Sequence, residues 1–160
     1  MRRATLVFPL DADRVLLGLK KRGFGAGKWN GFGGKVEDES VREAAARELA
    51  EECGLHAHPD DLIDAGVLEF SLPDVDLQVH IFRAERFSGT VKSSEEMEPR
   101  WYRVAEIPYA SMWEDDYHWL PYVLEGRVVS GTFIFEGDRI ISMHLMVRNP
   151  SGKDLDDQGP

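Results

Sequence analysis

The chain has 160 residues, of which 42% are hydrophobic, 10% aromatic and 30% charged, and its formal net charge is −10. This length and composition predict one globular domain over residues 1–148, and they exclude a fibrous or disordered protein. The acidic balance argues against a nucleic-acid polymer as partner, whereas a small polyphosphate still fits if bound divalent cations reverse the local field.

The sequence also has features that bear on cellular location and on cysteine chemistry. The sequence contains no apolar run long enough to cross a membrane, and its N-terminus lacks the apolar core and cleavage site of a secretory signal. Cys53 is the only cysteine, which excludes an internal disulfide and a CxxC-type zinc site. We therefore expect a cytoplasmic monomer without membrane association.

The first elements in chain order are two β-rich runs, at 5–10 and 14–20, which predict a hairpin around residues 11–13. A glycine-rich stretch over 23–34 follows, in which no ordinary strand or helix is expected. The S-x-x-E pattern from Ser40 to Glu43 is a capping box, and the alanine-rich segment behind it ends at Gly54. These signals predict a helix over 40–53.

Further strands are predicted at 65–72, 77–87 and 100–104, with a turn at residues 73–74. A proline-interrupted helix is expected over 109–124, and a last hairpin over 131–136 and 139–147. Residues 149–160 have little to bury and are predicted to form a disordered tail. Because strands and helices do not alternate regularly, the pattern favours an α+β class with a mixed sheet and helices on its faces.

The helix at 40–53 carries an unusual cluster of acids. Glu48, Glu51 and Glu52 project from one side, where like charges destabilise a helix by about 0.2–0.5 kcal/mol per pair, and the last turn also disfavours anions. Clustered hard oxygens are what Mg²⁺ or Mn²⁺ requires. The alternative is a solvated acidic face. Gly33 and Gly34 lie ahead of the helix, as expected if the backbone passes close to a ligand and turns abruptly.

These residues resemble the Nudix box, G-x₅-E-x₇-R-E-U-x-E-E-x-G-U, in which U is apolar. The segment RELAEECGL at 47–55 and the spacing from Glu39 to Arg47 match it fully. Only four residues separate Gly34 from Glu39, so the loop is one residue short and the pattern closes only from Gly33. The resemblance implies a Nudix fold, an α-β-α sandwich around a mixed sheet, and hydrolysis of a diphosphate linked to another moiety.

The likeness extends past the box to nearly the whole of residues 1–147, and the segments that carry it are 16–35, 93–108 and 112–135. These segments are similar to the animal branch of the family, which hydrolyses oxidised purine nucleoside triphosphates such as 8-oxo-dGTP and 2-hydroxy-dATP and so sanitises the nucleotide pool. Carried over by position, the resemblance implies base contacts from Asn30, Trp113, Asp115 and Asp116, and a pocket lined also by Thr5, Lys20, Phe24 and Phe70. It implies a metal site formed by Gly33, Gly34, Glu48, Glu51, Glu52 and Glu96, with Glu96 either metal-linked or catalytic.

The chemistry of the residues is compatible with this. If Asp115 and Asp116 are partly buried, one could stay protonated and donate a hydrogen bond while the other accepts, which suits a purine edge in more than one tautomer. Asn30 offers a donor and an acceptor, and Trp113 a stacking face. The alternatives are a helix N-cap or an exposed acidic turn for the two aspartates, and an ordinary core position for the tryptophan.

Other residue types suggest no competing chemistry. The five histidines form no HExxH set and are read as structural or surface residues, and Cys53 has no base next to it that would make it a nucleophile. The segment 20–22, Lys-Lys-Arg, is either a solvated strand end or a phosphate contact.

The resulting hypothesis is a Mg²⁺-dependent hydrolase acting on nucleoside triphosphates. Glu48, Glu51 and Glu52 hold the metal, and water attacks the β-phosphorus to release a nucleoside monophosphate and pyrophosphate. The general base is left open among Glu48, Glu52 and Glu96. Two alternatives remain. One is a Nudix enzyme for dGTP, a dinucleoside polyphosphate or ADP-ribose, and the other is a non-catalytic Nudix domain that senses a nucleotide.

Overall fold

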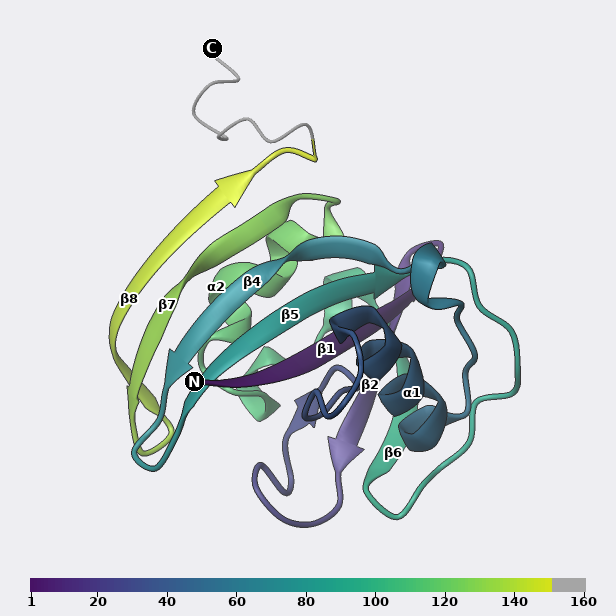
Figure 1. The fold of residues 1–160 in the computed structure, drawn as a ribbon, viewed down its shortest axis with the longest axis horizontal. Coiled ribbons are helices and arrows are strands. Elements are labelled where there is room, and N and C mark those ends of the chain that lie inside the picture. Colours follow the sequence, from purple (N-terminus) through teal and green to yellow (C-terminus); the bar gives the residue numbers. More distant parts are fainter. Residues whose placement is uncertain (151–160) are drawn as a thin grey trace.

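The central feature of the computed structural model, which describes residues 1–150, is a mixed sheet of eight strands (Figure 1). Their order is β3-β2-β1-β5-β4-β7-β8, and β6 pairs with β2 outside this path. The pairs β1–β5 and β4–β7 are parallel and the others antiparallel. The strands are β1 (Arg2–Asp11), β2 (Arg14–Lys20), β3 (Trp29–Asn30), β4 (Ile63–Ser71), β5 (Asp76–Ala84), β6 (Met97–Arg103), β7 (Val128–Glu136) and β8 (Arg139–Arg148).

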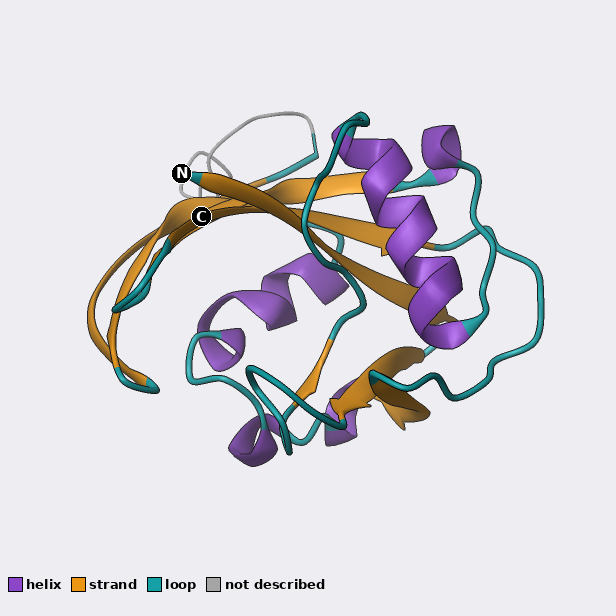
Figure 2. Cartoon of the chain, turned by 60° about the horizontal axis from the view of Figure 1, so that its bottom comes forward, coloured by secondary structure: helices purple, strands orange, loops and turns teal. Residues whose placement is uncertain are grey.

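Helices lie on both sides of this sheet (Figure 2). The helix α1 (Val41–Cys53) packs against β1 and β6, and α2 (Asp116–Leu124) packs against β7. Three short 3₁₀ helices connect other elements: η1 (Pro59–Asp61), η2 (Val104–Glu106) and η3 (Tyr109–Ser111). The expected α-β-α arrangement around a mixed sheet is therefore confirmed. Within residues 1–150, no helix has the length and apolar character needed to cross a membrane.

Two hydrophobic cores follow from the alternation of strand side chains. On β1, Val7 points into the core beneath α1 and Phe8 into the core beneath α2. On β2, Leu16 and Leu17 divide in the same way, because successive residues of a strand face opposite sides of the sheet. All four side chains are fully buried. The first two strands therefore tie both helices to one framework.

The local signals around α1 are confirmed. The Ser40 side chain accepts a hydrogen bond from the Glu43 N–H, and the Glu43 side chain accepts one from the Ser40 N–H. At the other end, Gly54 adopts a φ of 83°, and its N–H donates to the carbonyl of Ala50. The left-handed conformation there explains the glycine, since a side chain would be strained.

The single helix predicted over 109–124 is wrong. The segment divides into η3 and α2, and Pro121 lies inside α2 without ending it. Between them Met112 is extended, with φ −125° and ψ 174°, and its side chain is buried. Tertiary burial overrides the helical periodicity here. The short β3 within the glycine-rich stretch was not expected, and most of the predicted tail lies outside the described residues.

Replacing Ser40 by Ala should lower the free energy of unfolding by about 1 kcal/mol, because the capping box loses the oxygen that satisfies the Glu43 N–H. Urea denaturation followed by circular dichroism measures the change. The matched control is Ser142→Ala on the exposed edge strand β8, for which a change below about 0.5 kcal/mol is expected. Equal losses in both variants would contradict a capping role.

Candidate active site

The acids of α1 face a glycine-rich strand end. Glu52 is only 8% exposed, and its Oε1 accepts a hydrogen bond of 2.9 Å from the Gly33 N–H. Burial raises the pKa of the Glu52 carboxyl to about 7, with the Gly33 N–H opposing that rise and the nearby charge of Glu48 adding to it. Burial also raises the pKa of Glu48. Burial thus disfavours the charged form of both carboxyls, even though Arg47 pairs with Glu48, and this is a condition that favours a cation between them.

Gly33 and Gly34 are required by close approach. A Cβ on Gly33 would lie 1.7 Å from the Thr5 carbonyl oxygen, and one on Gly34 would lie 2.7 Å from the Glu48 carboxyl carbon. Neither glycine has a positive φ, so close approach, and not a left-handed conformation, explains the glycines at these two positions. The left-handed glycines lie earlier, at Gly23, Gly25 and Gly27 in the loop after β2.

Arg47 forms ion pairs with three glutamates around it. Its guanidinium donates to both carboxylate oxygens of Glu39, with an Nη2–Oε1 distance of 2.7 Å. It also reaches Glu48 Oε1 at 2.9 Å and Glu51 Oε2 at 3.4 Å. The hydrogen bonds from Arg47 lower the pKa of Glu39. The loop that is one residue short therefore still places Glu39 within hydrogen-bond distance of Arg47.

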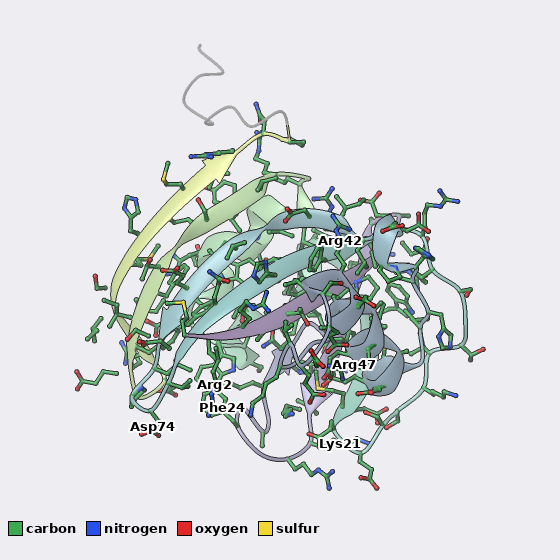
Figure 3. The ribbon with its side chains drawn as sticks, in the orientation of Figure 1. Arg2, Lys21, Phe24, Arg42, Arg47 and Asp74 are labelled. Atoms are coloured by element: carbon green, nitrogen blue, oxygen red, sulfur yellow. The ribbon has the colours of Figure 1, made fainter. Side chains whose placement is uncertain are left out.

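Glu96 lies in the loop just before β6 and pairs with the cationic residues at the end of β2. Its Oε2 accepts from Lys20 Nζ at 2.9 Å and its Oε1 from Arg22 Nε at 3.0 Å. Hydrogen bonds from Lys20 and then Arg22 lower the pKa of Glu96. Figure 3 shows Lys21 and Phe24 on the loop that leaves β2, below Arg47 on α1. The cationic segment 20–22 thus holds acidic side chains in this structure.

The acids are held apart by these partners. Within residues 1–150, no three Asp, Glu, His or Cys side chains stand close enough together to form a ready metal cluster. Glu48 is held by Arg47, Glu52 by the Gly33 N–H, and Glu96 by Lys20. The donor set still suits a hard divalent cation, because the carboxylate oxygens of Glu48 and Glu52 are partly buried or buried, and Glu48 shares its cationic partner Arg47 with Glu39 and Glu51.

Beside these acids lies a cavity of about 270 Å³. Ten predicted residues line it together: Thr5, Lys20, Phe24, Asn30, Gly33, Gly34, Phe70, Trp113, Asp115 and Asp116. The four glutamates Glu48, Glu51, Glu52 and Glu96 are not among its walls. Apolar wall residues that sequence reasoning missed are Ala4, Leu6, Leu72, Leu77, Val79 and Phe135. Strand alternation brings Ala4 and Leu6 to one face of β1, and Leu77 and Val79 to one face of β5.

The two aspartates form the polar end of this cavity. Asp115 is 5% exposed and Asp116 2%, so the exposed-turn alternative is wrong, and Asp115 makes no capping hydrogen bond with its side chain. Burial raises the pKa of Asp115 to about 6, partly offset by a hydrogen bond from Trp119. Burial and the neighbouring Asp115 charge raise the pKa of Asp116 well above its usual range. The pair therefore keeps a proton to higher pH than two ordinary aspartates would.

Two buried oxygens in the cavity lack protein partners. They are Thr5 Oγ1 and Asp116 Oδ2. An unpaired buried polar atom costs about 1–3 kcal/mol, so its presence in a cavity wall indicates a place for a ligand group. Asn30 has its carbonyl oxygen accepting from the Gly31 N–H at 2.8 Å, which leaves its NH₂ as the group for a ligand.

Aromatic rings form another wall. Trp113 stacks on Phe24 with centroids 5.0 Å apart, and the Lys28 ammonium lies 5.0 Å from the Trp113 ring centre. Phe24 itself is 71% exposed, on the loop with three left-handed glycines. An apolar slot with a few convergent polar groups is the usual form of a site for a planar organic ligand.

The comparisons with known proteins agree with this geometry. The model of the NUDIX domain matches residues 1–123. The chain belongs to the Nudix family. This Nudix hydrolase is 47% identical to the oxidized purine nucleoside triphosphate hydrolases of mouse, over 88% of this chain and 92% of that protein, and of zebrafish, over 89% and 92%.

The fold of this Nudix hydrolase also matches a solved structure, that of a mutator MutT protein from Bacillus halodurans. The two are 27% identical with a TM-score of 0.79, covering 91% of this chain and 97% of the other. Nudix hydrolases generally depend on a divalent metal ion. Cys53, buried with its pKa raised to about 11, offers no thiolate for an alternative nucleophile.

The pH dependence of stability tests the buried aspartate pair. In the unfolded chain an aspartate loses its proton near pH 4, whereas Asp116 keeps its proton to higher pH in the fold. The native state then binds more protons, so the stability falls as pH rises from about 4 toward the folded pKa. The substitution Asp116→Asn removes this pH-dependent loss of stability. Urea denaturation should give the variant a higher free energy of unfolding than the wild type at pH 7, and the same free energy near pH 4.

The control for this experiment is Asp138→Asn, in the exposed turn between β7 and β8. Its stability relative to the wild type should be the same at both pH values. A difference for Asp116→Asn that does not depend on pH would show that packing, and not ionisation, is responsible.

Proposed function

We propose that the chain hydrolyses oxidised purine nucleoside triphosphates, with Mg²⁺, to the nucleoside monophosphate and pyrophosphate. The observation that carries the proposal is that Gly33 lies where the acids of α1 meet the cavity. This residue donates its N–H to Glu52 and also lines the cavity that ends at Asp115 and Asp116. A purine in the cavity therefore has its phosphates directed toward the acids of α1. The two relatives named for this reaction support the substrate class.

The proposed division of work follows from burial and charge. Trp113 and Phe70 provide apolar faces for the base, while Asn30 and the two aspartates meet its polar edge. Lys20 lines the cavity and provides a cation for the phosphates. Arg47 keeps Glu48 and Glu51 oriented toward the same side of α1 as Glu52.

Glu48, Glu51, Glu52 and Glu96, with the backbone of Gly33 and Gly34, are the groups proposed to hold Mg²⁺. When bound, the cation neutralises phosphate charge and polarises the reacting centre. The new bond joins water oxygen to the β-phosphorus, the bridging bond to the α-phosphate breaks, and a glutamate takes the proton from water. Glu52 suits that last role because burial brings its pKa to about 7, near the working pH. Glu48 and Glu96 remain candidates.

Replacing Glu52 by Gln should reduce kcat by at least about a hundredfold, because the oxygen that accepts the proton or holds the cation is lost. Pyrophosphate release from 8-oxo-dGTP with Mg²⁺ measures this, and circular dichroism verifies the fold. Glu106→Gln, at an exposed position in η2, is the matched control and should leave the rate within about twofold. Activity of Glu52→Gln close to that of the control would remove Glu52 from the machinery.

A panel of nucleotides tests the substrate class. The wild type should show a higher kcat/KM for 8-oxo-dGTP and 2-hydroxy-dATP than for dGTP, ADP-ribose or a dinucleoside polyphosphate. Asn30→Ala should reduce that preference by about tenfold, because one good polar contact to a base contributes about 1–3 kcal/mol of discrimination. Equal rates for oxidised and ordinary purines in the wild type would defeat the proposed specificity. Binding without turnover would indicate a nucleotide sensor.

A further inference from the structure

The ammonium of Lys20 and the guanidinium of Arg22 converge on one carboxylate, that of Glu96. Lys20 Nζ donates to Oε2 over 2.9 Å, and Arg22 Nε donates to Oε1 over 3.0 Å. The residue between them, Lys21, donates instead to the Ser93 hydroxyl over 2.6 Å. Alternate residues of the segment therefore have different partners, and Lys20 and Arg22 together form a cationic cradle around one anionic group.

This cradle adjoins both the cavity and the acids of α1. Lys20 lines the cavity, whereas Arg22 is not among its walls and its side chain is 61% exposed. Burial raises the pKa of Glu52, and the charge of Lys20 opposes that rise while the charge of Glu96 adds to it, so the cradle lies within electrostatic reach of α1. A phosphate chain that leaves the cavity therefore meets Lys20 first and Arg22 farther out.

Glu96 occupies the cradle as an internal anion. Carboxylates and phosphates both present charged oxygens that Lys and Arg bind with charge-assisted hydrogen bonds. Each oxygen of Glu96 is taken by one cation, and Glu95 accepts a further bond of 3.1 Å from Arg22 Nη2. An incoming phosphate must compete with Glu96 for both cations. Because Glu96 is also among the groups proposed to hold Mg²⁺, its move toward that site leaves the cradle open.

We propose that Arg22 is a specificity-determining residue that binds the terminal phosphate when Glu96 leaves the cradle, and that it thereby makes the enzyme prefer nucleoside triphosphates over diphosphates. This inference rests on the proposed function of the same site. A diphosphate has one phosphate fewer beyond the bond that breaks, so it reaches Lys20 but not Arg22. The exposure of Arg22 fits this role, since the terminal phosphate lies farthest from the base.

The first experiment measures phosphate binding without metal or turnover. Inorganic tripolyphosphate is titrated into the protein in EDTA at low ionic strength, with isothermal calorimetry as the readout. Glu96→Gln should bind it about fivefold more tightly than the wild type, because a neutral amide competes less for the two cations. Adding Arg22→Gln to that variant should remove the gain.

The matched control is Glu98→Gln, which makes the same change of charge two residues along the chain. Glu98 pairs with Lys21 at 3.7 Å and not with the cradle, so tripolyphosphate binding should stay within about twofold of the wild type. Equal tightening in Glu96→Gln and Glu98→Gln would overturn the inference, because it would reflect net charge alone. No detectable binding by Glu96→Gln would also overturn it.

The second experiment compares kcat/KM for 8-oxo-dGTP and 8-oxo-dGDP with Mg²⁺. The wild type should prefer the triphosphate. Arg22→Gln should lower kcat/KM for the triphosphate by about tenfold, and for the diphosphate by less than about twofold, because only the longer chain loses a charge-assisted contact. Arg14→Gln, which removes an exposed, ion-paired arginine at the other end of β2, should leave both values within about twofold.

The outcomes separate this inference from the proposed function. If Arg22→Gln lowers both kcat/KM values equally, or leaves that of the triphosphate unchanged, hydrolysis stands and the role of Arg22 is rejected. If the wild type hydrolyses no nucleotide, the proposed function is rejected. The tripolyphosphate titration, which needs neither a base nor turnover, then still decides whether the cradle binds phosphate.

Discussion

The approach of Gly33 to β1 is the contact on which the arrangement of the site depends. The backbone at Gly33 lies so close to Thr5 that no side chain fits, and its N–H is directed at Glu52. One peptide unit therefore joins the sheet, α1 and the cavity wall. Any Cβ at this position would separate β1 from the strand end that carries Asn30, and it would displace the donor that partly offsets the burial of Glu52.

Buried acids occur at both ends of the site, and in each case a single N–H limits the cost. The Gly33 backbone N–H donates a hydrogen bond to Glu52, and the Trp119 indole N–H donates one to Asp115. Neither bond cancels the effect of burial, since the pKa of both carboxyls stays raised. The fold thus tolerates two destabilising clusters in the places where we propose that base recognition and cation binding occur, as is common where activity and stability compete.

The ion pairs around Arg47 explain how the shortened loop is accommodated. Arg47 forms ion pairs with Glu48 and Glu51 of its own helix. It also pairs with Glu39, eight residues earlier, even though one residue is missing before Glu39. The loss falls in the loop at 35–39, while the helix keeps its capping box and its left-handed Gly54. A local deletion is absorbed because loops adapt more easily than packed elements.

The features readable from sequence are those with local causes. The bounds of α1, the strand alternation and the spacing of the Nudix acids all depend on neighbours within a few residues. The split between η3 and α2 was not readable, because the burial of Met112 outweighs helical periodicity. The sequence by itself determined the family and its acidic chemistry. Only the tertiary structure decided that Leu77, Val79 and Phe135 complete the cavity wall and that Trp119 reaches Asp115, since these contacts depend on the pairing and packing of distant segments.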